Sequence, residues 1–182
     1  MKKIVLGVSG SISAYKAADI ANRLTKKGYD VHCVLTKAGS EFITALTLET
    51  LSKNRVHDDL FSREEPRKVE HISLAEEADL ILLAPASADL IAKMAVGLAD
   101  DLLTSLLLAA DPKKVVIAPA MNVHMYENPL TQRNLRVLQK LGMEVIEPRE
   151  GHLACGDTGR GALAEVDVIV QYADERLTER TV

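Results

Sequence analysis

Two short apolar runs constrain the fold of this chain more than any other feature. Residues 81–84 (Ile-Leu-Leu-Ala) and 115–118 (Val-Val-Ile-Ala) carry no polar side chain. As strands they would bury both faces, which is typical of central strands in a parallel sheet that helices cover on each side. The two runs therefore predict an α/β fold.

Other short β-branched runs alternate with longer helical patterns along the chain. We expect strands at residues 3–8, 30–36, 79–84, 113–118 and 143–147. A first helix at about residues 13–27 would end at Gly28, a typical residue just beyond a helix C-terminus. This alternation predicts a doubly wound, Rossmann-like parallel sheet, and 182 residues suit a single domain.

Three further segments have local signals. Ser73 and Glu76 have the spacing of a capping box, so a short helix should begin there and leave His71 in the loop before it, able to point into a cleft. Residues 100–110 carry leucines around the whole circumference of a helix, which predicts a buried helix, in the core or between subunits. The charged tail after Asp174 should fray.

Composition narrows the class of protein. The net charge of −4, the absence of Trp and the small number of other aromatics argue against a nucleic-acid partner. The apolar start breaks at Gly7, too early for a signal peptide, and no run is long enough to span a membrane. We therefore expect no membrane association and a cytoplasmic location.

Two cysteines are present, and we do not expect a disulfide between them in that location. Cys33 alternates with apolar residues in a predicted strand and should be an inert core thiol. Cys155 lies in a glycine-rich loop and is a candidate for chemistry. No Cys/His spacing suggests a metal site, and His32, His57 and His124 are expected to be structural or solvated.

Polar residues follow several of the predicted strands, and ligands bind at this carboxyl edge in open parallel sheets. The first strand leads into Gly7-Val8-Ser9-Gly10-Ser11-Ile12-Ser13, a segment that is either a tight turn or a phosphate-binding loop. It lacks the Gly-x-Gly-x-x-Gly fingerprint, and Thr36 and Lys37 follow the second strand where a dinucleotide fold would have an acidic residue. A mononucleotide therefore fits better than NAD.

The third and fourth strands end in further candidates. Ser87 or Asp89 can either cap the next helix or contact a ligand, and capping alone explains each of them. Asn122 follows the run at residues 115–118 and could simply hydrogen-bond to its own loop. The convergence of these strand ends on one edge favours a binding role for Asn122.

Together these segments resemble the flavin-dependent cysteine decarboxylase family over essentially the whole chain. The resemblance rests on Gly-Ser-Ile-Ser at 10–13, on His71, on Pro-x-Ser-Ala at 85–88, on Pro-Ala-Met-Asn-x-x-Met at 119–125 and on Ala-Cys-Gly-Asp at 154–157. The last two motifs, in this order, are the most specific.

The resemblance implies roles for individual residues. An FMN cofactor would be held by Ser9, Gly10, Ser11, Thr36, Ser87, Ala88, Asp89, Leu90 and Ala120. His71 would be the active-site base or proton shuttle, Asn122 would bind the substrate carboxylate, and Cys155 would be a proton donor on a mobile clamp. His152, Ala154 and Leu163 would lie near the substrate.

The implied reaction is the conversion of 4′-phosphopantothenoylcysteine to 4′-phosphopantetheine in coenzyme A biosynthesis. Oxidation of the cysteine to a thioaldehyde would allow CO2 to leave, and reduction of the resulting enethiol would restore the flavin. The resemblance also implies a trimer or a trimer-based homo-oligomer with flavin near a subunit interface. It leaves open whether a phosphopantothenoylcysteine synthetase acts as a separate partner.

Three alternatives remain. A peptidyl-cysteine decarboxylase would stop at the enethiol, and Cys155 argues against it because that chemistry needs no final reduction. A flavin prenyltransferase is disfavoured by the motifs at 119–125 and 154–157. An inactive flavin-binding regulatory subunit is disfavoured by the joint presence of His71, Asn122 and Cys155.

Overall fold

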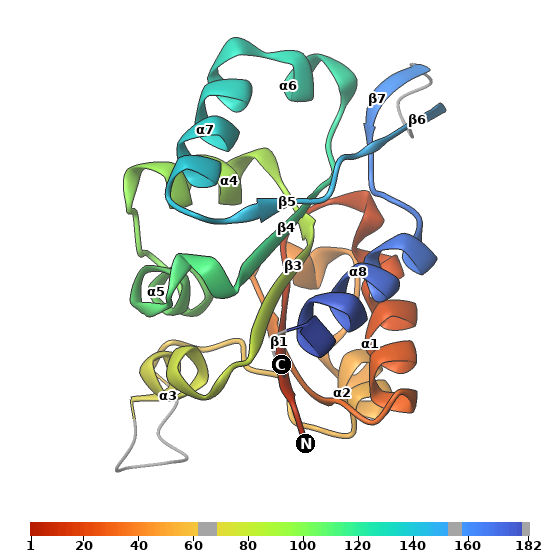
Figure 1. Ribbon diagram of the computed structural model, residues 1–182, viewed down its shortest axis with the longest axis vertical. Helices are drawn as coiled ribbons and strands as arrows, with labels where there is room; N and C mark the ends of the chain where they lie inside the picture. Colours follow the sequence, from red (N-terminus) through yellow and green to blue (C-terminus); the bar gives the residue numbers. More distant parts are fainter. Residues whose placement is uncertain (62–68, 153–157, 180–182) are drawn as a thin grey trace.

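A five-stranded parallel sheet forms the centre of the molecule (Figure 1). The computed structural model describes residues 1–61, 69–152 and 158–179. The sheet has the order β2-β1-β3-β4-β5, with all neighbours parallel. Its strands are β1 (Lys3–Val8), β2 (Asp30–Leu35), β3 (Leu80–Ala86), β4 (Val115–Pro119) and β5 (Glu144–Val145). The predicted doubly wound parallel sheet is confirmed.

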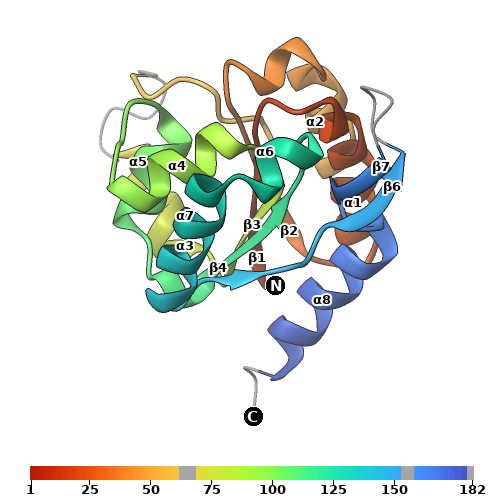
Figure 2. The same cartoon turned by 90° about the horizontal axis from the view of Figure 1, so that it is seen from above.

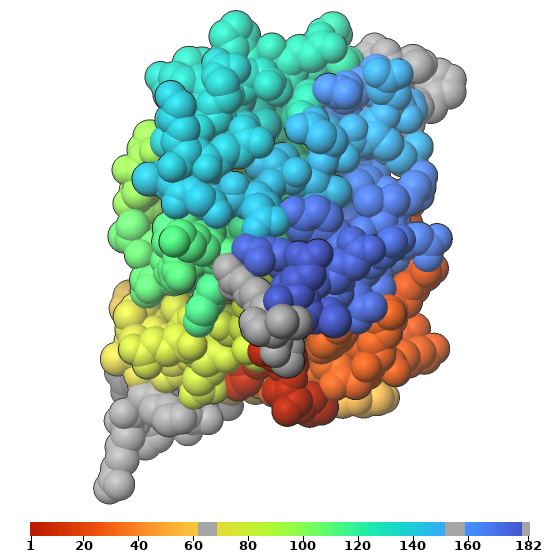
Figure 3. Space-filling view, viewed as in Figure 1, coloured from red at the N-terminus to blue at the C-terminus, as the bar shows by residue number. Residues whose placement is uncertain are grey.

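Helices cover both faces of this sheet (Figures 1 and 2). One face carries α1 (Lys16–Lys26), α2 (Ala45–Ser52) and α8 (Val166–Glu179). The other carries α3 (Glu70–Glu77), α4 (Ala88–Val96), α5 (Leu102–Ala109), α6 (Val123–Glu127) and α7 (Pro129–Lys140). In the space-filling view α8 lies over its face beside α1 (Figure 3). Short 3-10 helices are η1 (Ile12–Tyr15), η2 (Gly39–Glu41) and η3 (Pro112–Lys114).

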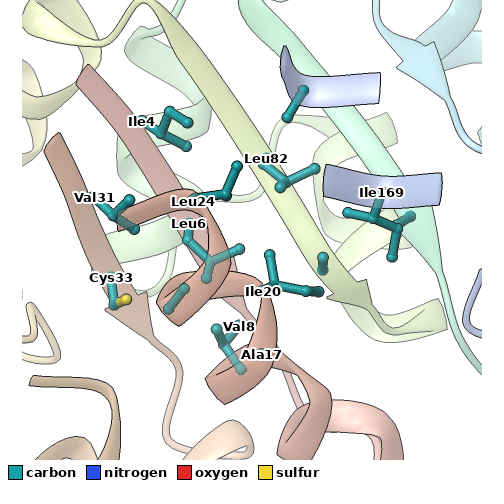
Figure 4. Packing of buried hydrophobic residues seen from close by; sticks show 14 of the residues in the cluster. Ile4, Leu6, Val8, Ala17, Ile20, Leu24, Val31, Cys33, Leu82 and Ile169 are labelled. Atoms are coloured by element: carbon teal, nitrogen blue, oxygen red, sulfur yellow. The ribbon is translucent and has the colours of Figure 1, made fainter. Parts of the chain in front are cut away.

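The strands divide their side chains between two hydrophobic clusters, because successive residues of a strand point to opposite faces. In β1, Ile4 and Leu6 join the cluster under α1 and α8, whereas Val5 joins the other cluster. Figure 4 shows the first cluster, in which Leu82 of β3 and Ile169 of α8 point toward one another across the layer. All five of these side chains are fully buried, so the core fixes the sheet between its helical layers.

Element boundaries differ in detail from the expected ones. The predicted first helix is divided into η1 and α1, and it ends before Gly28, whose φ of 91° confirms the predicted helix end. Strand β4 starts at Val115 because Pro112–Lys114 form η3. The fifth strand is only Glu144–Val145.

The predicted start of the short helix before β3 is wrong. Helix α3 begins at Glu70 and its N-cap, Val69, makes no side-chain cap, so His71 lies in the first turn rather than in a preceding loop. The Ser73 hydroxyl donates to the Val69 carbonyl instead of capping a helix that starts at its own position.

The predictions for residues 100–110 and for the tail after Asp174 have different outcomes. In α5, Leu102, Leu103, Leu106 and Leu107 are buried as predicted, whereas Leu108 is 62% exposed. The tail expected to fray after Asp174 instead continues as α8 to Glu179, because Leu177 packs into the core and is 3% exposed.

A two-stranded antiparallel hairpin, β6 (Arg149–His152) and β7 (Thr158–Ala162), follows the sheet. It lies beside α6, and the Met121 N–H donates to the Gly161 carbonyl at 2.9 Å. This bond fastens the hairpin to the segment that follows β4. No helix within the described ranges is long and apolar enough to cross a membrane.

Candidate functional site

A cavity of about 1050 Å³ lies at the carboxyl edge of the sheet. The chain runs from β1 outward to β2 and then crosses back to β3, so the order reverses between β1 and β3. Such a switch point is where open α/β sheets bind ligands. The cavity is lined by the segments after β1, β2, β3 and β4 and by part of the hairpin. The predicted convergence of polar strand ends is confirmed.

The residues expected to hold a cofactor all line this cavity. They are Ser9, Gly10, Ser11, Thr36, Ser87, Ala88, Asp89, Leu90 and Ala120. Two residues expected near a substrate, Asn122 and Leu163, also line it. A single chain therefore brings eleven of the predicted site residues together at one cavity.

Ser9 joins the ends of β1 and β3. Its side chain donates to the Pro85 carbonyl and accepts from the Ser87 N–H, both at 2.8 Å, and the residue is 2% exposed. The Ser9 hydroxyl hydrogen is thus already donated to a protein carbonyl. Ser9 shapes the floor of the cavity by holding two loops at a fixed separation.

Several other hydroxyl groups organise the loops in the same way. Ser87 caps α4 by accepting from the Leu90 N–H at 3.2 Å, which confirms the capping alternative, and Ser11 accepts from the Ser13 N–H at 3.3 Å. Thr36 Oγ1 accepts from the Gly39 N–H at 3.0 Å. The side chains hold the loop shape, so the backbone amides at the cavity edge are the natural donors for an anion.

Gly10 lets the loop after β1 pack closely against the loop after β2. A Cβ built on Gly10 would lie 2.6 Å from the Ala38 Cβ, far inside van der Waals contact. Any side chain at Gly10 would separate the loop after β1 from the loop after β2. The Gly-Ser segment is therefore a close-packed cradle at this edge.

Charged groups around the cavity are unevenly paired. Lys93 lies 3.2 Å from both Asp89 and Asp100, and although burial opposes it, hydrogen bonds to the two carboxylates raise the Lys93 pKa. Asp89 is thus an exposed ion-pair partner at the rim. Within the described residues, Lys16 and Lys37 line the cavity without an ion pair. The side of the cavity next to β1 and β2 can therefore attract an anion.

Asn122 bonds to its own loop, which is one of the two alternatives that the sequence left open, and it also lies at the cavity. Its Oδ1 accepts from the His124 N–H at 2.8 Å and caps α6, so the amide does bond to its own loop. The same half-buried residue lines the cavity. Because Oδ1 faces the helix, the Nδ2 group is the end of the amide that can donate to a ligand.

His71 is the predicted site residue that the single chain does not bring to the cavity. It is half-buried on α3 and does not line the cavity, and its side chain makes no hydrogen bond among the described residues. Ala154 and Cys155 lie outside the described residues, and so does the side chain of His152 at the end of β6. Cys33 is buried in the core as predicted, and burial raises its pKa to about 12.

Sequence reasoning missed several lining residues. Tyr15, Phe42, Met121 and Arg149 add aromatic, apolar and cationic surface to the cavity. Arg149 Nε lies 3.1 Å from Glu165 Oε1, which orients this side chain. Tyr15 follows the Gly-Ser segment closely enough to have been suspected, but Phe42 carries no sequence signal and is brought in by η2.

The described residues fit a flavin mononucleotide. The backbone cradle at Gly10 and the N-terminus of α4 suit one phosphate, and Leu90, Ala120 and Leu163 provide apolar surface for a ring system. No group of three or more His, Cys, Asp or Glu among the described residues is arranged to hold a metal ion.

Fold and cavity together define an α/β protein with a ligand-binding cavity at the β1/β3 switch point. The chain belongs to the Flavoprotein family, whose model matches residues 1–178.

Similarity to individual proteins is extensive. The chain is 52% identical over 178 residues to a probable phosphopantothenoylcysteine decarboxylase of Streptococcus mutans, covering 97% of this chain and 99% of that protein. It is 44% identical over 180 residues to the coenzyme A biosynthesis bifunctional protein CoaBC of Bacillus subtilis, covering 99% of this chain but 44% of that longer protein. A mutant PPC decarboxylase complexed with pantothenoylaminoethenethiol superimposes with a TM-score of 0.86 at 35% identity, covering 96% of this chain and 97% of that one.

Proposed function

We propose that this protein is an FMN-dependent decarboxylase that converts 4′-phosphopantothenoylcysteine to 4′-phosphopantetheine in coenzyme A biosynthesis. The observation that carries the proposal is the position of Asn122, a neutral amide that lines the cavity at the carboxyl edge of the sheet together with all the residues expected to hold FMN. Similarity along the whole chain to the Streptococcus mutans relative supports the same activity. We place the enzyme in the cytoplasm on the basis of this pathway.

FMN, when bound, supplies the oxidation and reduction that make loss of CO2 possible. The protein supplies the rest. The cradle at Gly10 and the amides at the start of α4 hold the phosphate, and Lys16 and Lys37, which make no ion pair within the described residues, favour anionic ligands on that side. Leu90 and Leu163 exclude water from the reacting end of the cavity.

Asn122 orients the carboxylate that will leave. A neutral amide donates a hydrogen bond without the strong charge pairing that would stabilise the carboxylate against losing CO2. The α6 cap holds the amide in place before substrate arrives. Asn122 therefore positions the substrate without strongly stabilising its ground state.

His71 acts in a neighbouring subunit of a homotrimer or trimer-based assembly, because its own cavity does not include it. Exposed apolar side chains support an interface on this side of the molecule. Val69 and Ile72 flank His71 and are 58% and 38% exposed, and Leu108 on the neighbouring α5 is 62% exposed. In this arrangement His71 moves the proton that the reaction requires.

The hairpin β6–β7 and Leu163, which directly follows β7, cover the substrate. The roles expected of Ala154 and Cys155 stay predictions, because these two residues lie outside the described ranges. His152 lies at the end of β6. We expect Cys155→Ser to release CO2 and then stall with reduced flavin and the enethiol, because a hydroxyl is a much weaker acid than a thiol. Product analysis by mass spectrometry with flavin absorbance checks this, and normal phosphopantetheine yield would show that the thiol is dispensable.

Gly161→Ala should displace the hairpin from Asn122. A Cβ on Gly161 would lie 2.5 Å from the Met121 carbonyl oxygen, so one of the two segments must move. Misplacement by about 1 Å can cost roughly 100-fold in rate, and we expect a loss of kcat/KM of roughly 10- to 100-fold with flavin still bound.

Gly28→Ala is the matched control for this change. Gly28 also has a positive φ, but a Cβ there meets nothing within 4 Å and the residue lies at the end of α1. Steady-state kinetics and thermal unfolding of both variants separate the effects. Equal kcat/KM losses in the two variants would contradict a role for the Gly161–Met121 contact.

The proposed function is tested directly on purified protein. We expect flavin absorbance, CO2 release from 4′-phosphopantothenoylcysteine, and formation of 4′-phosphopantetheine without external reductant. CO2 release only from peptides ending in cysteine would indicate a peptidyl-cysteine decarboxylase. Bound flavin with no CO2 from either substrate would indicate an inactive regulatory relative.

A phosphopantothenoylcysteine synthetase is the expected partner. Its product would be the substrate of this enzyme, and the fused relative named as a coenzyme A biosynthesis bifunctional protein supports such a link. Co-purification of the two separate chains checks whether they associate.

A further inference from the structure

A row of four titratable side chains links β2 to the first turn of α3, outside the cavity. Asp30 Oδ2 lies 3.1 Å from His32 Nε2, and His32 Nδ1 lies 3.4 Å from His57 Nε2. The His57 Nδ1 atom contacts Glu70 Oε1, and the two imidazole rings stack with their centroids 5.7 Å apart. The row ends at the residue directly before His71.

His57 is a rigid member of this row. Its N–H donates to the Cys33 carbonyl and its carbonyl accepts from the Leu35 N–H, both at 2.9 Å, as an isolated parallel bridge beside β2. Within the described residues, the N-cap of α3, Val69, makes no side-chain hydrogen bond to the first turn of this helix. The contact from His57 to Glu70 therefore ties this turn to the sheet.

The number of hydrogens that the three contacts in this row require indicates how the two imidazoles are protonated. Burial opposes ionisation of Asp30, but hydrogen bonds from Asn54 and His32 lower its pKa, so Asp30 is ionised. With Glu70 also ionised, all three contacts need a hydrogen from an imidazole nitrogen. Two neutral imidazoles carry only two N–H groups, so the pair must hold one additional proton.

That proton belongs on His57. Burial lowers the pKa of His32, and this effect outweighs the opposing influence of Asp30. A neutral His32 then donates from Nε2 to Asp30 and accepts at Nδ1. His57 donates to His32 from one nitrogen and to Glu70 from the other.

We propose that His57 and Glu70 are positioning residues for His71, with a protonated His57 holding the first turn of α3 against the sheet. The inference rests on the role proposed for His71 in the reaction. The charged groups that face the histidine pair are Asp30 on β2, Lys3 on β1 and Glu70 on α3. This row of contacts, from Asp30 to Glu70, anchors the first turn of α3 to β2.

Two substitutions of Glu70 test this in the FMN-loaded enzyme. Glu70→Ala removes the anchor and should lower kcat roughly 10- to 100-fold with KM and flavin content unchanged. Glu70→Gln should restore kcat, because its amide can keep a hydrogen bond with His57 Nδ1. Unchanged kcat in Glu70→Ala, or no rescue by Glu70→Gln, would overturn the inference.

Glu76→Ala is the matched control, since it removes an exposed carboxylate from the same helix. Its kcat should match that of the unmodified enzyme, and a loss equal to that of Glu70→Ala would overturn the inference. A His71→Asn variant with full activity would refute the role of His71 itself. Loss in His71→Asn with full activity in Glu70→Ala would refute only the positioning role.

Imidazole 15N NMR of the same enzyme gives a readout that does not depend on activity. Near neutral pH we expect both ring nitrogens of His57 to carry hydrogens and His32 to carry one at Nε2. A neutral His57 at that pH would overturn the proton assignment.

Discussion

Asn122→Asp should abolish CO2 release while leaving the fold and the bound flavin intact. Aspartate caps helices about as well as asparagine, so the cap of α6 by the side chain at this position is retained. The substrate carboxylate, however, would meet a like charge. At about 4 Å and an effective dielectric constant of about 20, two like charges repel by about 4 kcal/mol, which is roughly a thousandfold in binding.

A matched control is available within the same segment. Asn128 caps α7 by accepting from the Leu130 N–H at 2.9 Å, as Asn122 caps α6, but Asn128 is exposed and does not line the cavity. Asn128→Asp should therefore retain normal turnover. CO2 release by Asn122→Asp within tenfold of the unmodified rate would contradict the carboxylate role, and equal losses in both variants would point to the helix caps instead.

The cofactor loops of the site could be predicted from sequence because the topology alone brings them together. Residues 81–84 and 115–118 are apolar throughout, and such runs must be central parallel strands. Once that order is set, the segments after β1, β3 and β4 have to meet at one edge. Ser9, Ser87 and Asn122 could thus be placed without knowing any contact between them.

Other parts depend on contacts that sequence spacing does not encode. The Ser73 and Glu76 spacing suggested a helix start, but the Ser73 hydroxyl bonds to Val69 and the helix begins earlier at Glu70. Charge after Asp174 suggested fraying, yet one buried residue, Leu177, holds the last turn of α8. In the first place a different local bond outweighs the expected signal, and in the second a tertiary contact does so.

The hairpin β6–β7 is a third case. Its strands Arg-Glu-Gly-His and Thr-Gly-Arg-Gly-Ala show no apolar alternation. The bond from Met121 to the Gly161 carbonyl fixes its position instead. A hairpin held by backbone contacts to another loop leaves almost no pattern in sequence, so a flexible loop was the natural expectation there.

His71 presents the sharpest difference between the predicted site and a single chain. Sequence reasoning grouped it with Asn122, whereas the cavity that contains Asn122 does not include His71. Both can be right if each active site takes Asn122 from one subunit and His71 from its neighbour. We therefore expect His71→Asn alone to keep bound flavin and to lose CO2 release.

Mixed oligomers of two inactive variants distinguish shared sites from sites within one chain. In a cyclic trimer co-assembled from equal amounts of His71→Asn and Asn122→Asp chains, roughly a quarter of the sites would receive an intact Asn122 and an intact neighbouring His71. We expect co-expression to restore about that fraction of the unmodified CO2 release rate. The control is a mixture of the two variants, each purified separately and kept under conditions in which they exchange no subunits. This mixture should stay inactive. If co-expressed chains also stay inactive while forming mixed oligomers, His71 does not act across the interface.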